Sequence, residues 1–372
     1  MVQLIVLCNG AAGAEKQALA LGARLHRKLR DKNVMNLSSV QCVRITLTQS
    51  LLIPPLLQVL GARLTRNPYF GYIRQDLERY FSEQIKTKDL NVLIGCGRST
   101  VALSAVLKQL EPTKIFNVQI QHPRVSLQWF DTVVAPKHDF PRGVGRKDHV
   151  FLTSGTIHDI TPELLRQQSC EWKEELDKKL QGRQTRVVWL VGGPCRGFLF
   201  TEQDAKKMVE EFTQAFPHCD DVAVLLTFSR RTPLTVQKIL HQELIARYPM
   251  TGQVFVVQGT ERQNPYYALL ATASYIVTTP DSISMTTEAI AAGKPVFTIG
   301  MEMCKGKFLR FHQALFDSRA TSPLTPNATR LTLLRAGHDD TSSRASVALE
   351  NEICSIADTI ASAIYRQRKN AI

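Results

Sequence analysis

The chain has 372 residues, too many for one ordinary hydrophobic core and enough for two domains of roughly 150 to 180 residues each. A hydrophobic fraction of 44% and a charged fraction of 21% are ordinary for a globular protein and exclude disorder as its dominant state. The net charge is +13, and residues 1–180, with 25 Lys and Arg against 16 Asp and Glu, contribute +9 of it, which favours nucleotides, anionic membrane surfaces or acidic proteins as partners.

Simple patterns argue against metal and nucleic acid as ligands. The eight cysteines are scattered, without a CxxC pair or a His at zinc spacing, so we expect reduced thiols of an intracellular protein and no metal site. No recognition motif and no interleaving of basic and aromatic residues point to nucleic acid. Because a predicted strand starts almost at once, we expect no presequence and a cytosolic chain whose membrane contact is peripheral.

The longest apolar run is LLIPPLLQVLGA, residues 51–62. It falls well short of the about 20 residues that span a bilayer. Pro54 and Pro55 interrupt it. The segment is either a docking surface or a core helix broken by these prolines, and the sequence leaves both open.

In the first half of the chain, short apolar runs alternate with amphipathic stretches. The runs predict buried strands at 3–8, 40–47, 92–94, 114–119, 131–135 and 149–152. The amphipathic stretches predict helices at 15–30, 69–85 and 161–180. In the first helix we expect Leu19, Ala20 and Ala23 to face the core. Its basic residues are expected to face outward: Arg24, Arg27, Lys28 and Arg30. Strands that are apolar throughout are typical of a parallel sheet covered on both faces.

The second half repeats this design. Strands are predicted at 187–191, 222–227, 254–257 and at both ends of 275–300, and helices at 201–216, after Pro233 and from Asn264. We therefore predict an α/β protein of two Rossmann-like, doubly wound parallel-sheet domains that face a cleft, with ligands at the carboxyl ends of the strands. The expected parts are an N-terminal domain, a C-terminal nucleotide-binding-type domain, a flexible polar insert and a C-terminal helix that packs back on the body, at 1–180, 181–320, 321–346 and 347–372.

Residues 275–300 carry the clearest ligand-binding pattern: a strand, a polar turn, a short helix, a turn and a second strand. A small-residue turn before a helix builds an anion site, because unpaired N–H groups and the positive end of the helix dipole converge there. Asp281, Ser282 and Ser284 occupy this turn, and Glu288 lies one helical turn further, where a carboxylate could bond two ribose hydroxyls. A plain capped helix, with Asp281 or Ser282 as N-cap and Glu288 solvated, fits the same residues.

Five segments resemble a known family: IGCGRSTVALSAV, FNVQIQHPRVSLQWFDTVVAPKHDF, FSRRTP, NPYYALLATASYIVTTPDSISMTTEA and GKPVFTIGMEMCKGKFLRFHQAL. They are similar, in the same order over roughly residues 1–320, to the mitochondrial fission family named for the elongated mitochondria of plant mutants, which has bacterial relatives. The resemblance implies a glycosyltransferase-B-like scaffold. It also implies a factor on the cytosolic face of the mitochondrial outer membrane and in the cytosol, peripheral to the membrane, that helps to localise a dynamin-related GTPase.

The resemblance also assigns a nucleotide-sugar site to the second domain. The loop and helix that hold the diphosphate and ribose correspond to Asp281, Ser282, Ser284, Met285 and Glu288. A glycine turn, the next strand end and the base pocket correspond to Gly192, Gly193, Ser229, Arg230, Arg231, Thr232, Asn264 and Tyr266. An Arg can pair with a phosphate through two hydrogen bonds, but Arg231 also fits a surface residue and Asn264 a helix cap. Pro280 stands where relatives commonly have Ala, which removes one N–H from the loop.

In the first domain the same scaffold places a second set of residues at the cleft. These are Gly10, Gly13, Gly95, Gly97, Arg98, His122 and Arg124. Gly97 and Arg98 at a predicted helix start suit an anion best. His122 is the candidate catalytic base, because an imidazole titrates near neutral pH, although a His before Pro123 also fits a structural turn.

Two functions therefore remain open. The first is a fission factor that requires no cofactor and whose scaffold has a nucleotide sugar as its candidate ligand. The second is an active nucleotide-sugar-dependent glycosyltransferase. A protein that binds a nucleotide sugar without turnover would combine the two.

Overall fold

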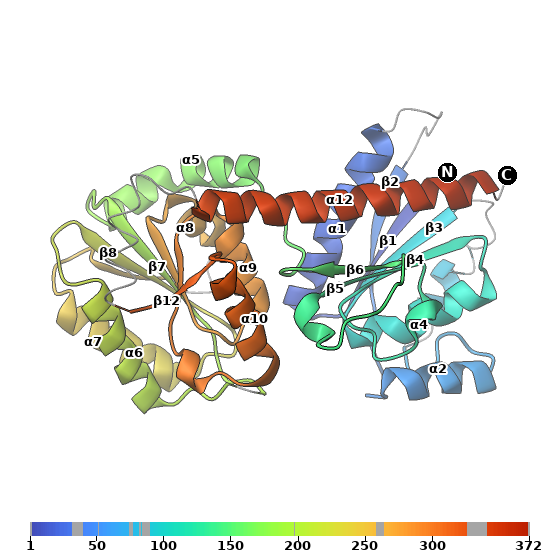
Figure 1. Ribbon diagram of the computed structural model, residues 1–372, viewed down its shortest axis with the longest axis horizontal. Coiled ribbons are helices and arrows are strands. Elements are labelled where there is room, and N and C mark those ends of the chain that lie inside the picture. The colour runs from blue at the N-terminus through green and yellow to red at the C-terminus, as the bar shows by residue number, and fades with distance from the viewer. Residues whose placement is uncertain are drawn as a thin grey trace. The chain divides into compact units, whose positions relative to one another are not determined.

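The computed structural model describes residues 2–31, 40–50, 52–73, 77–81, 83, 90–196, 198–257, 264–325 and 341–370. Contacts divide the chain into two compact units (Figure 1). Unit 1 comprises Met1–Asp159 and Asn351–Ile372, and unit 2 comprises Ile160–Glu350. Within the described residues each unit contains one six-stranded parallel sheet with helices on its faces, so the predicted fold class of two doubly wound α/β domains is confirmed.

The described strands of unit 1 have the order β2-β1-β3-β4-β5-β6. They are β1 (Val2–Cys8), β2 (Val40–Thr46), β3 (Leu90–Cys96), β4 (Ile115–Ile120), β5 (Thr132–Pro136) and β6 (Val150–Thr153). All neighbours are parallel, and Val2 pairs with Val40 on one side and with Leu90 on the other. The winding of the sheet thus reverses between β1 and β3, the position at which doubly wound folds bind ligands.

Side chains of the central strands alternate between two apolar layers, because successive residues of a strand point to opposite faces. Leu4 and Val6 pack with α1 (Ala12–Asp31) and with the last part of α12 (Thr341–Asn370). Ile5 and Leu7 pack on the other face with α4 (Arg98–Leu110). A further helix, α2 (Pro55–Leu64), lies outside α4 and not on the sheet (Figure 1). Two short 3-10 turns, η1 (Leu127–Trp129) and η2 (Lys137–Asp139), follow β4 and β5.

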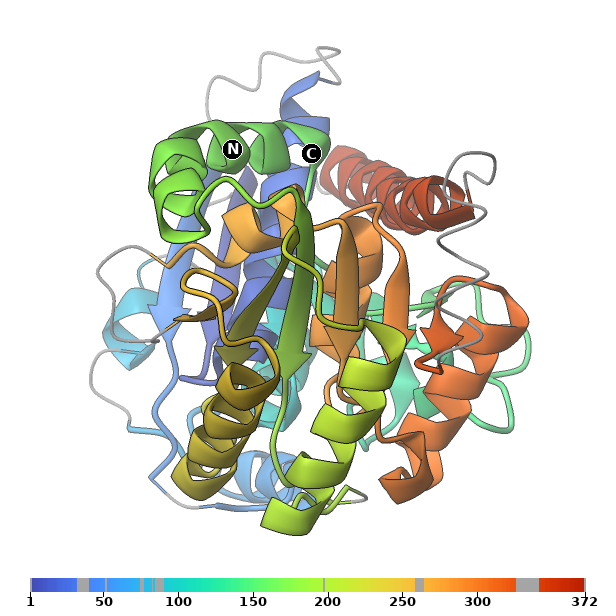
Figure 2. The same ribbon diagram turned by 90° about the vertical axis from the view of Figure 1, so that its left-hand side faces the viewer.

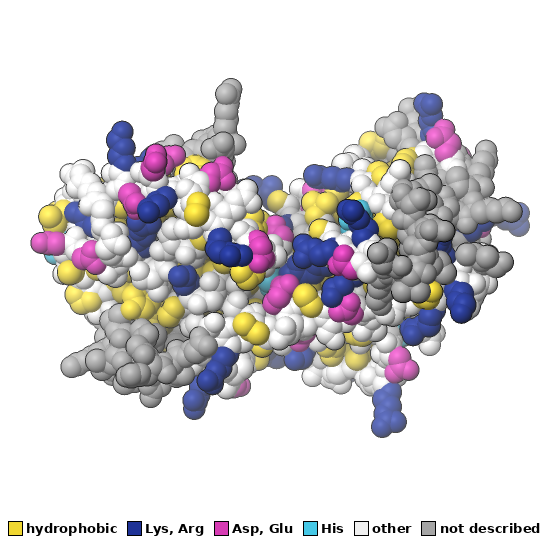
Figure 3. Space-filling model, turned by 90° about the horizontal axis from the view of Figure 1, so that it is seen from above, with side chains coloured by type: hydrophobic (Ala, Val, Ile, Leu, Met, Phe, Trp, Pro, Cys, Tyr) yellow, Lys and Arg dark blue, Asp and Glu magenta, His cyan; other side chains and the backbone are white. Residues whose placement is uncertain are grey.

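The predicted orientation of the first helix is only partly confirmed, since Ala20 is buried and Arg27 and Arg30 are exposed as expected. The buried stripe of α1 repeats every fourth residue and includes Leu21, Leu25 and Leu29. Leu19 and Ala23 are exposed instead, because the leucine stripe removes more apolar area from water. Arg24, expected outward, is buried, and Lys28 pairs with Asp358 of α12 (Nζ to Oδ2, 2.9 Å). In Figure 3 the basic side chains of the described residues are interspersed with acidic ones.

The described strands of unit 2 have the order β12-β11-β10-β7-β8-β9, again all parallel. They are β7 (Thr185–Val191), β8 (Val222–Phe228), β9 (Val254–Val257), β10 (Tyr275–Thr278), β11 (Val296–Thr298) and β12 (Ser322–Pro323). The helices are α5 (Pro162–Lys179), α6 (Glu202–Ala215), α7 (Leu234–Arg247), α8 (Tyr266–Thr272), α9 (Ile283–Ala291) and α10 (Gly306–Asp317), with the 3-10 turn η3 (Met301–Met303). Figure 2 shows helices on both sides of this sheet.

Side chains on the two faces of the unit 2 sheet also form two apolar layers. Val188 and Leu190 face the core that contains α5, α8 and α9. Trp189 faces the core that contains α6 and α7, where its ring stacks on that of Phe212 with the centroids 4.6 Å apart. Two apolar layers on a buried central strand explain why β7 is apolar from Val187 to Val191.

The boundaries of the units differ from the predicted domain limits. Unit 2 begins at Ile160, before the expected boundary at 180, because Trp172 and Leu176 of α5 pack in the same core as Leu269 of α8. α12 begins at Thr341, so residues 341–346 of the expected flexible insert are helical. The insert also contributes β12, and residues 326–340 lie outside the described part of the chain. Apolar residues further along α12 stabilise the helix despite its polar start.

Among the described residues, the helix predicted at 69–85 is found only at 77–81 and 83, and a different structure precedes it. Residues 68–71 form a turn, Tyr72 makes an isolated bridge to Gln49, and residues 77–81 are helical. The remaining positions of that prediction, 74–76, 82, 84 and 85, lie outside the described residues. The Asn67 side chain favours the turn, because its oxygen accepts a hydrogen bond from the Tyr69 amide (3.0 Å).

Candidate functional site

Three turns of unit 2 lie side by side at the carboxyl edge of its sheet. They follow β7, β8 and β10, which are neighbours in a parallel sheet and therefore end at the same edge. The turns are residues 192–194, 229–232 and 279–282, and the last leads into α9. We call them the strand-end turns of unit 2.

Asp281 joins the three strand-end turns of unit 2. Its side chain is 0% exposed and accepts hydrogen bonds from the Gly193 amide (3.0 Å), the Thr279 hydroxyl (2.7 Å) and the Arg231 guanidinium (2.8 Å). Each turn thus contributes one donor. The three donors replace the water that burial removes from the carboxylate. Asp281 therefore positions the turns and does not itself face a ligand.

Gly192 and Gly193 are required by close approach of the chain, since neither has a positive φ. A Cβ on Gly192 would overlap the carboxylate of Asp281. A Cβ on Gly193 would overlap the main chain of Arg231 and Thr232. Only glycine allows the first turn to pack against the other two.

The second turn combines one half-exposed and one buried polar side chain. Arg231 is 45% exposed and donates to two carbonyls of the first turn, each at 3.3 Å, in addition to Asp281. Thr232 is buried and donates to the Gly192 carbonyl (2.7 Å), and the Ser229 hydroxyl lies 3.1 Å from that of Thr232. These hydroxyls close the turn, while Arg230 points into solvent.

α9 begins directly after the third turn. Ser282 is its N-cap, with φ −129° and ψ 99°, and its hydroxyl accepts a hydrogen bond from the Met285 amide (3.4 Å). The cap is therefore Ser282 and not Asp281. The first amides of a helix have no intrahelical acceptor and lie at the positive end of its dipole. The first backbone amides of α9, next to the half-buried Ser284, can therefore donate hydrogen bonds to an anion.

Glu288 lies one turn into α9 and is nearly buried, at 8% exposure. Its carboxylate accepts a hydrogen bond from the Tyr266 hydroxyl (2.7 Å). Asn264 is exposed, and its side-chain oxygen accepts from the Tyr266 amide (3.0 Å), so it closes the turn that leads into α8, whose N-cap is Pro265. A carboxylate has acceptor sites for several donors, so a ribose hydroxyl would share Glu288 with Tyr266.

Sequence reasoning missed His312, a fully buried residue of α10. Its Nε2 lies 3.2 Å from the Pro280 carbonyl and its Nδ1 lies 3.4 Å from the Thr298 hydroxyl, so it connects the third turn to β11. Helical spacing could have indicated its inward direction, because Phe311 and Leu315 lie on the same buried face.

Two cysteines near the strand-end turns of unit 2 remain uncharged near neutral pH. Burial raises the pKa of the Cys195 thiol, and it raises the pKa of the Cys304 thiol to about 11. A protonated thiol is a poor nucleophile and adds no negative charge beside an anion.

The glycine turns of unit 1 use both local and long-range hydrogen bonds, and the Asn9 side chain next to Gly10 donates to the Cys96 carbonyl (3.3 Å) and to the Ser99 hydroxyl (2.7 Å). Gly10 has φ +76°, and its amide donates to the Glu15 carboxylate (2.6 Å), so an acidic group already occupies that donor. Gly97, with φ +84°, caps α4 without a side-chain hydrogen bond, and Arg98 after it is exposed. The remaining two glycines differ. Gly95 packs against the Thr100 side chain, whereas Gly13 has open space around it.

His122 lies in a turn after β4. Its Nδ1 accepts a hydrogen bond from the Arg124 amide (3.0 Å), and its ring stacks on Phe140 at 4.4 Å. Burial and the charge of Arg124 lower the pKa of His122, and Asp139 opposes this shift. An Nδ1 that accepts requires the neutral ring to carry its proton on Nε2. In this tautomer the ring stabilises the turn and offers a donor, not a base.

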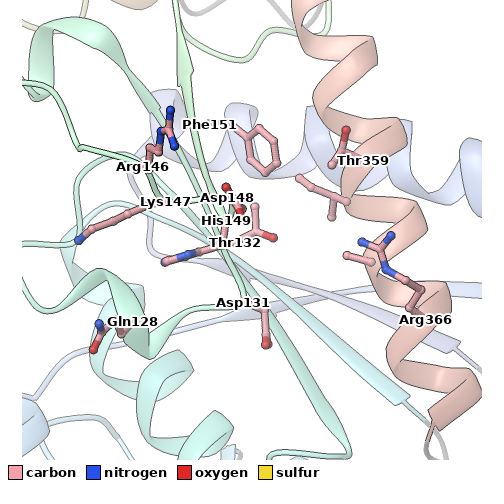
Figure 4. A pocket seen from close by; sticks show the side chains of 12 residues that line it. Gln128, Asp131, Thr132, Arg146, Lys147, Asp148, His149, Phe151, Thr359 and Arg366 are labelled. Carbon is pink, nitrogen blue, oxygen red and sulfur yellow. The ribbon is translucent and has the colours of Figure 1, made fainter.

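A pocket of about 560 Å³ lies elsewhere in unit 1, beside α12 (Figure 4). Arg366 of α12 points into it, while Lys147 points away (Figure 4). Two of its polar groups are already bonded: Asp131 pairs with Lys108 (2.8 Å), and the His149 ring lies 3.2 Å from the Leu127 carbonyl. Because this pocket adjoins the starts of β5 and β6, it is separate from the glycine turns at the strand ends.

The described residues contain neither a metal-binding cluster nor a membrane-spanning helix. No group of three or more His, Cys, Asp or Glu residues there is arranged to hold a metal ion. None of the described helices combines the length and the apolar character that a membrane crossing requires.

The fold and these turns define a glycosyltransferase-B-like scaffold. The structure is similar to the UDP co-structure of MnaA from S. aureus, with a TM-score of 0.56, 10% identity and coverage of 100% of this chain and 98% of that one. It is similar to UDP-GlcNAc 2-epimerase from Neisseria meningitidis bound to UDP-GlcNAc, with a TM-score of 0.54, 13% identity and coverage of 98% and 100%. A glycosyltransferase from Rickettsia africae gives a TM-score of 0.53 at 12% identity, with 98% of each chain covered.

The family follows from the sequence comparisons. Residues 12–364 match the family model described as mitochondrial fission ELM1, and the chain belongs to that family, as the resemblance predicted. It is 31% identical over 246 residues to the mitochondrial fission protein ELM1 of Arabidopsis thaliana, with 60% of this chain and 55% of that protein covered. It is 28% identical over 231 residues to an uncharacterised protein of Rickettsia prowazekii, with 56% and 64% covered. The chain thus spans less than two thirds of the length of either relative.

Proposed function

We propose that this chain is a mitochondrial fission factor that acts peripherally on the cytosolic face of the mitochondrial outer membrane. There it helps to localise a dynamin-related GTPase. Membership of the ELM1 family supports the fission role, because the match runs over residues 12–364. The location and the GTPase partner extend beyond this match and are part of the proposal.

We also propose that the strand-end turns of unit 2 bind a nucleotide sugar. The observation that carries this is the buried Asp281, which fixes three turns at the start of α9. Fixed amides at a helix start suit a diphosphate, and Glu288 one turn further suits the ribose. Tyr266 places a ring next to Glu288, where a base could stack. Two structures of similar fold, described as bound to UDP or UDP-GlcNAc, support this choice of ligand class.

Catalysis receives less support than binding. The candidate base, His122, uses Nδ1 to accept the Arg124 amide, and its lowered pKa favours the neutral ring. Proton abstraction at Nε2 would require the other tautomer and the loss of that hydrogen bond. The proposed role is therefore that of a nucleotide-sugar-binding scaffold, and an active glycosyltransferase is the alternative.

Calorimetry of the full chain with UDP-GlcNAc, UDP-glucose and GDP-mannose tests the ligand. We expect saturable binding of one of these compounds and at least about tenfold weaker binding by Glu288→Gln, since a hydrogen bond to a charged group is worth about 1.5–3 kcal/mol. Glu210→Ala, which removes an exposed carboxylate of α6, should bind like the wild type. Absence of binding, or equal binding by Glu288→Gln, would refute the site.

Microscopy of cells that lack the protein tests the fission role. We expect elongated, interconnected mitochondria and less dynamin-related GTPase on their surface, both restored by the wild-type chain. A chain with a fluorescent tag should lie at the mitochondrial surface. A normal network in its absence would contradict the fission role without any consequence for nucleotide binding.

A further inference from the structure

The outer face of α2 exposes an unusual run of large apolar side chains. Four of them belong to α2 and two flank it in the sequence, and all are between 42% and 96% exposed: Leu52, Leu56, Leu57, Leu60, Leu64 and Ile73. Four of these are spaced by four residues, from position 52 to position 64, so they follow one side of the helix and its approach. Single exposed leucines are normal, but a contiguous group of this kind marks an interaction surface. We call this group the α2 leucine face.

The α2 leucine face is not needed for the core of unit 1. The opposite side of α2 supplies the core contacts, since Val59 and Ala62 are buried among Val101, Ala102 and Ala105 of α4. A helix that is apolar on all sides is normally buried on all sides. Because α2 packs on α4 and forms no layer against the sheet, one side of it has no cover from the described residues of unit 1 (Figure 1).

The chain segment that contains the α2 leucine face carries basic residues and no acidic ones. Residues 32–75 contain no Asp or Glu. Arg63 and Arg66 lie at the end of α2, and Arg98 and Arg124 line a pocket of about 450 Å³ at its start, together with Leu52. Arg63 is held over the Trp129 ring (4.6 Å), whereas no salt bridge joins the other three arginines to any described residue. Two exposed arginines therefore lie at each end of the α2 leucine face.

The exposed leucines and the arginines beside them together indicate which kind of partner binds the α2 leucine face. A second copy of the chain, paired through the same face about a two-fold axis, would bring the four arginines against their own copies. A protein partner is usually anchored by aromatic side chains, and the α2 leucine face contains none. Aliphatic side chains that enter the boundary of the acyl region, with arginines beside them to contact phosphates, are the pattern of an interfacial helix.

We propose that the α2 leucine face binds an anionic phospholipid surface. Leu56, Leu57, Leu60 and Leu64 enter the interface, and Arg66, Arg98 and Arg124 contact lipid phosphates around them. The inference rests on the proposed function only in expecting membrane contact, and it does not depend on the nucleotide site. It also resolves the interpretation of residues 51–62 that the sequence left open, since α2 has a core side and a docking side.

Sedimentation with vesicles tests the proposal. The full chain is mixed with phosphatidylcholine vesicles, and separately with vesicles that also contain phosphatidylglycerol. We expect binding to the anionic vesicles that weakens as salt is added. Leu57→Glu with Leu64→Glu should lower the partition coefficient by at least about tenfold, because each charge must be kept out of the apolar layer. Arg66→Gln should reduce the salt dependence and weaken binding less.

A matched pair of changes controls for charge alone. Leu199 and Leu234 of unit 2 are 75% and 72% exposed, and Leu199→Glu with Leu234→Glu should bind vesicles like the wild type. Equal loss in both double variants, or no binding of the wild type to anionic vesicles, would overturn the proposal. It would also be overturned if the wild type were a dimer that only the α2 variant dissociates, with vesicle binding unchanged. Since no nucleotide is present, these outcomes are independent of the calorimetric test.

Discussion

The strand-end turns of the two units are built differently on similar sheets. In unit 2 one buried carboxylate, Asp281, bonds to donors from three turns that are far apart in the sequence. In unit 1 a half-buried amide, Asn9, joins two turns through the Cys96 carbonyl and the Ser99 hydroxyl, and other turn contacts are local, such as Gly10 to Glu15 and Arg124 to His122. Long-range bonds fix the relative positions of turns, whereas local bonds fix only the shape of each one. In unit 2 one buried group fixes three turns at once, which gives the preorganised edge that a ligand requires.

The largest difference in stability should come from glycine substitutions at the carboxyl edges of the two sheets. Gly192→Val places side-chain atoms where the Asp281 carboxylate lies and should destabilise unit 2 by about 3 kcal/mol or more. Gly13→Ala, at an open helical position of unit 1, should be neutral or stabilise by up to about 1 kcal/mol. Urea unfolding of both variants measures the difference. Similar midpoints would mean that the two edges are not packed differently.

Removal of the central carboxylate should have the next largest effect. Asp281→Ala leaves the Gly193 amide and the Thr279 hydroxyl without their acceptor, at about 1–3 kcal/mol for each buried group. Loss of the ion pair with Arg231 should cost less free energy of unfolding, because the Arg231 side chain is half exposed. In unit 1, Asn9→Ala removes the bond from Asn9 to the Ser99 hydroxyl (2.7 Å) and should cost about 1 kcal/mol. If Asn9→Ala lost more free energy of unfolding than Asp281→Ala, the turns of unit 1 would be the more strongly fixed ones.

The smallest effect should be the pH dependence due to His122. Burial lowers its pKa below the ordinary value of 6.5, so the unfolded chain takes up a proton at a higher pH than the folded chain. Its stabilising contribution is present above pH 6.5 and is lost as the pH falls through the lower, folded pKa. His122→Gln should therefore flatten the fall in stability on acidification. Parallel pH profiles for wild type and variant would contradict this assignment.

The fold class could be predicted because it depends on patterns within short stretches of the sequence. Apolar runs and amphipathic stretches alternate along the chain, and this pattern gave the strands β1 and β7 to β10 within a few residues. The orientation of α1 could not be obtained in the same way, because Leu19 and Leu21 are equally apolar and only packing against the sheet and α12 selects the buried stripe. The extent of α12 likewise depends on contacts that its polar first residues do not reveal.

The candidate site was predictable in position but not in the roles of its residues. Small residues after strands indicated the turns with Gly192, Arg231 and Asp281, since strand ends of a parallel sheet share one edge. That Asp281 points inward follows only from its meeting with Gly193 and Arg231, which are 88 and 50 residues away in the chain. His312 was missed for the same reason, because its partner is a main-chain carbonyl of the third turn.

Hydrogen exchange of the full chain, with and without UDP-GlcNAc, tests the central claim most directly. The ligand should protect amides of the second strand-end turn and of residues 282–288, where the turn meets α9, and should leave the turns of unit 1 at 10–13 unchanged. Glu288→Gln should lose this protection at the same ligand concentration. No protection in unit 2 at saturating ligand, or protection confined to the turns of unit 1, would contradict a nucleotide-sugar site at the edge that Asp281 holds together.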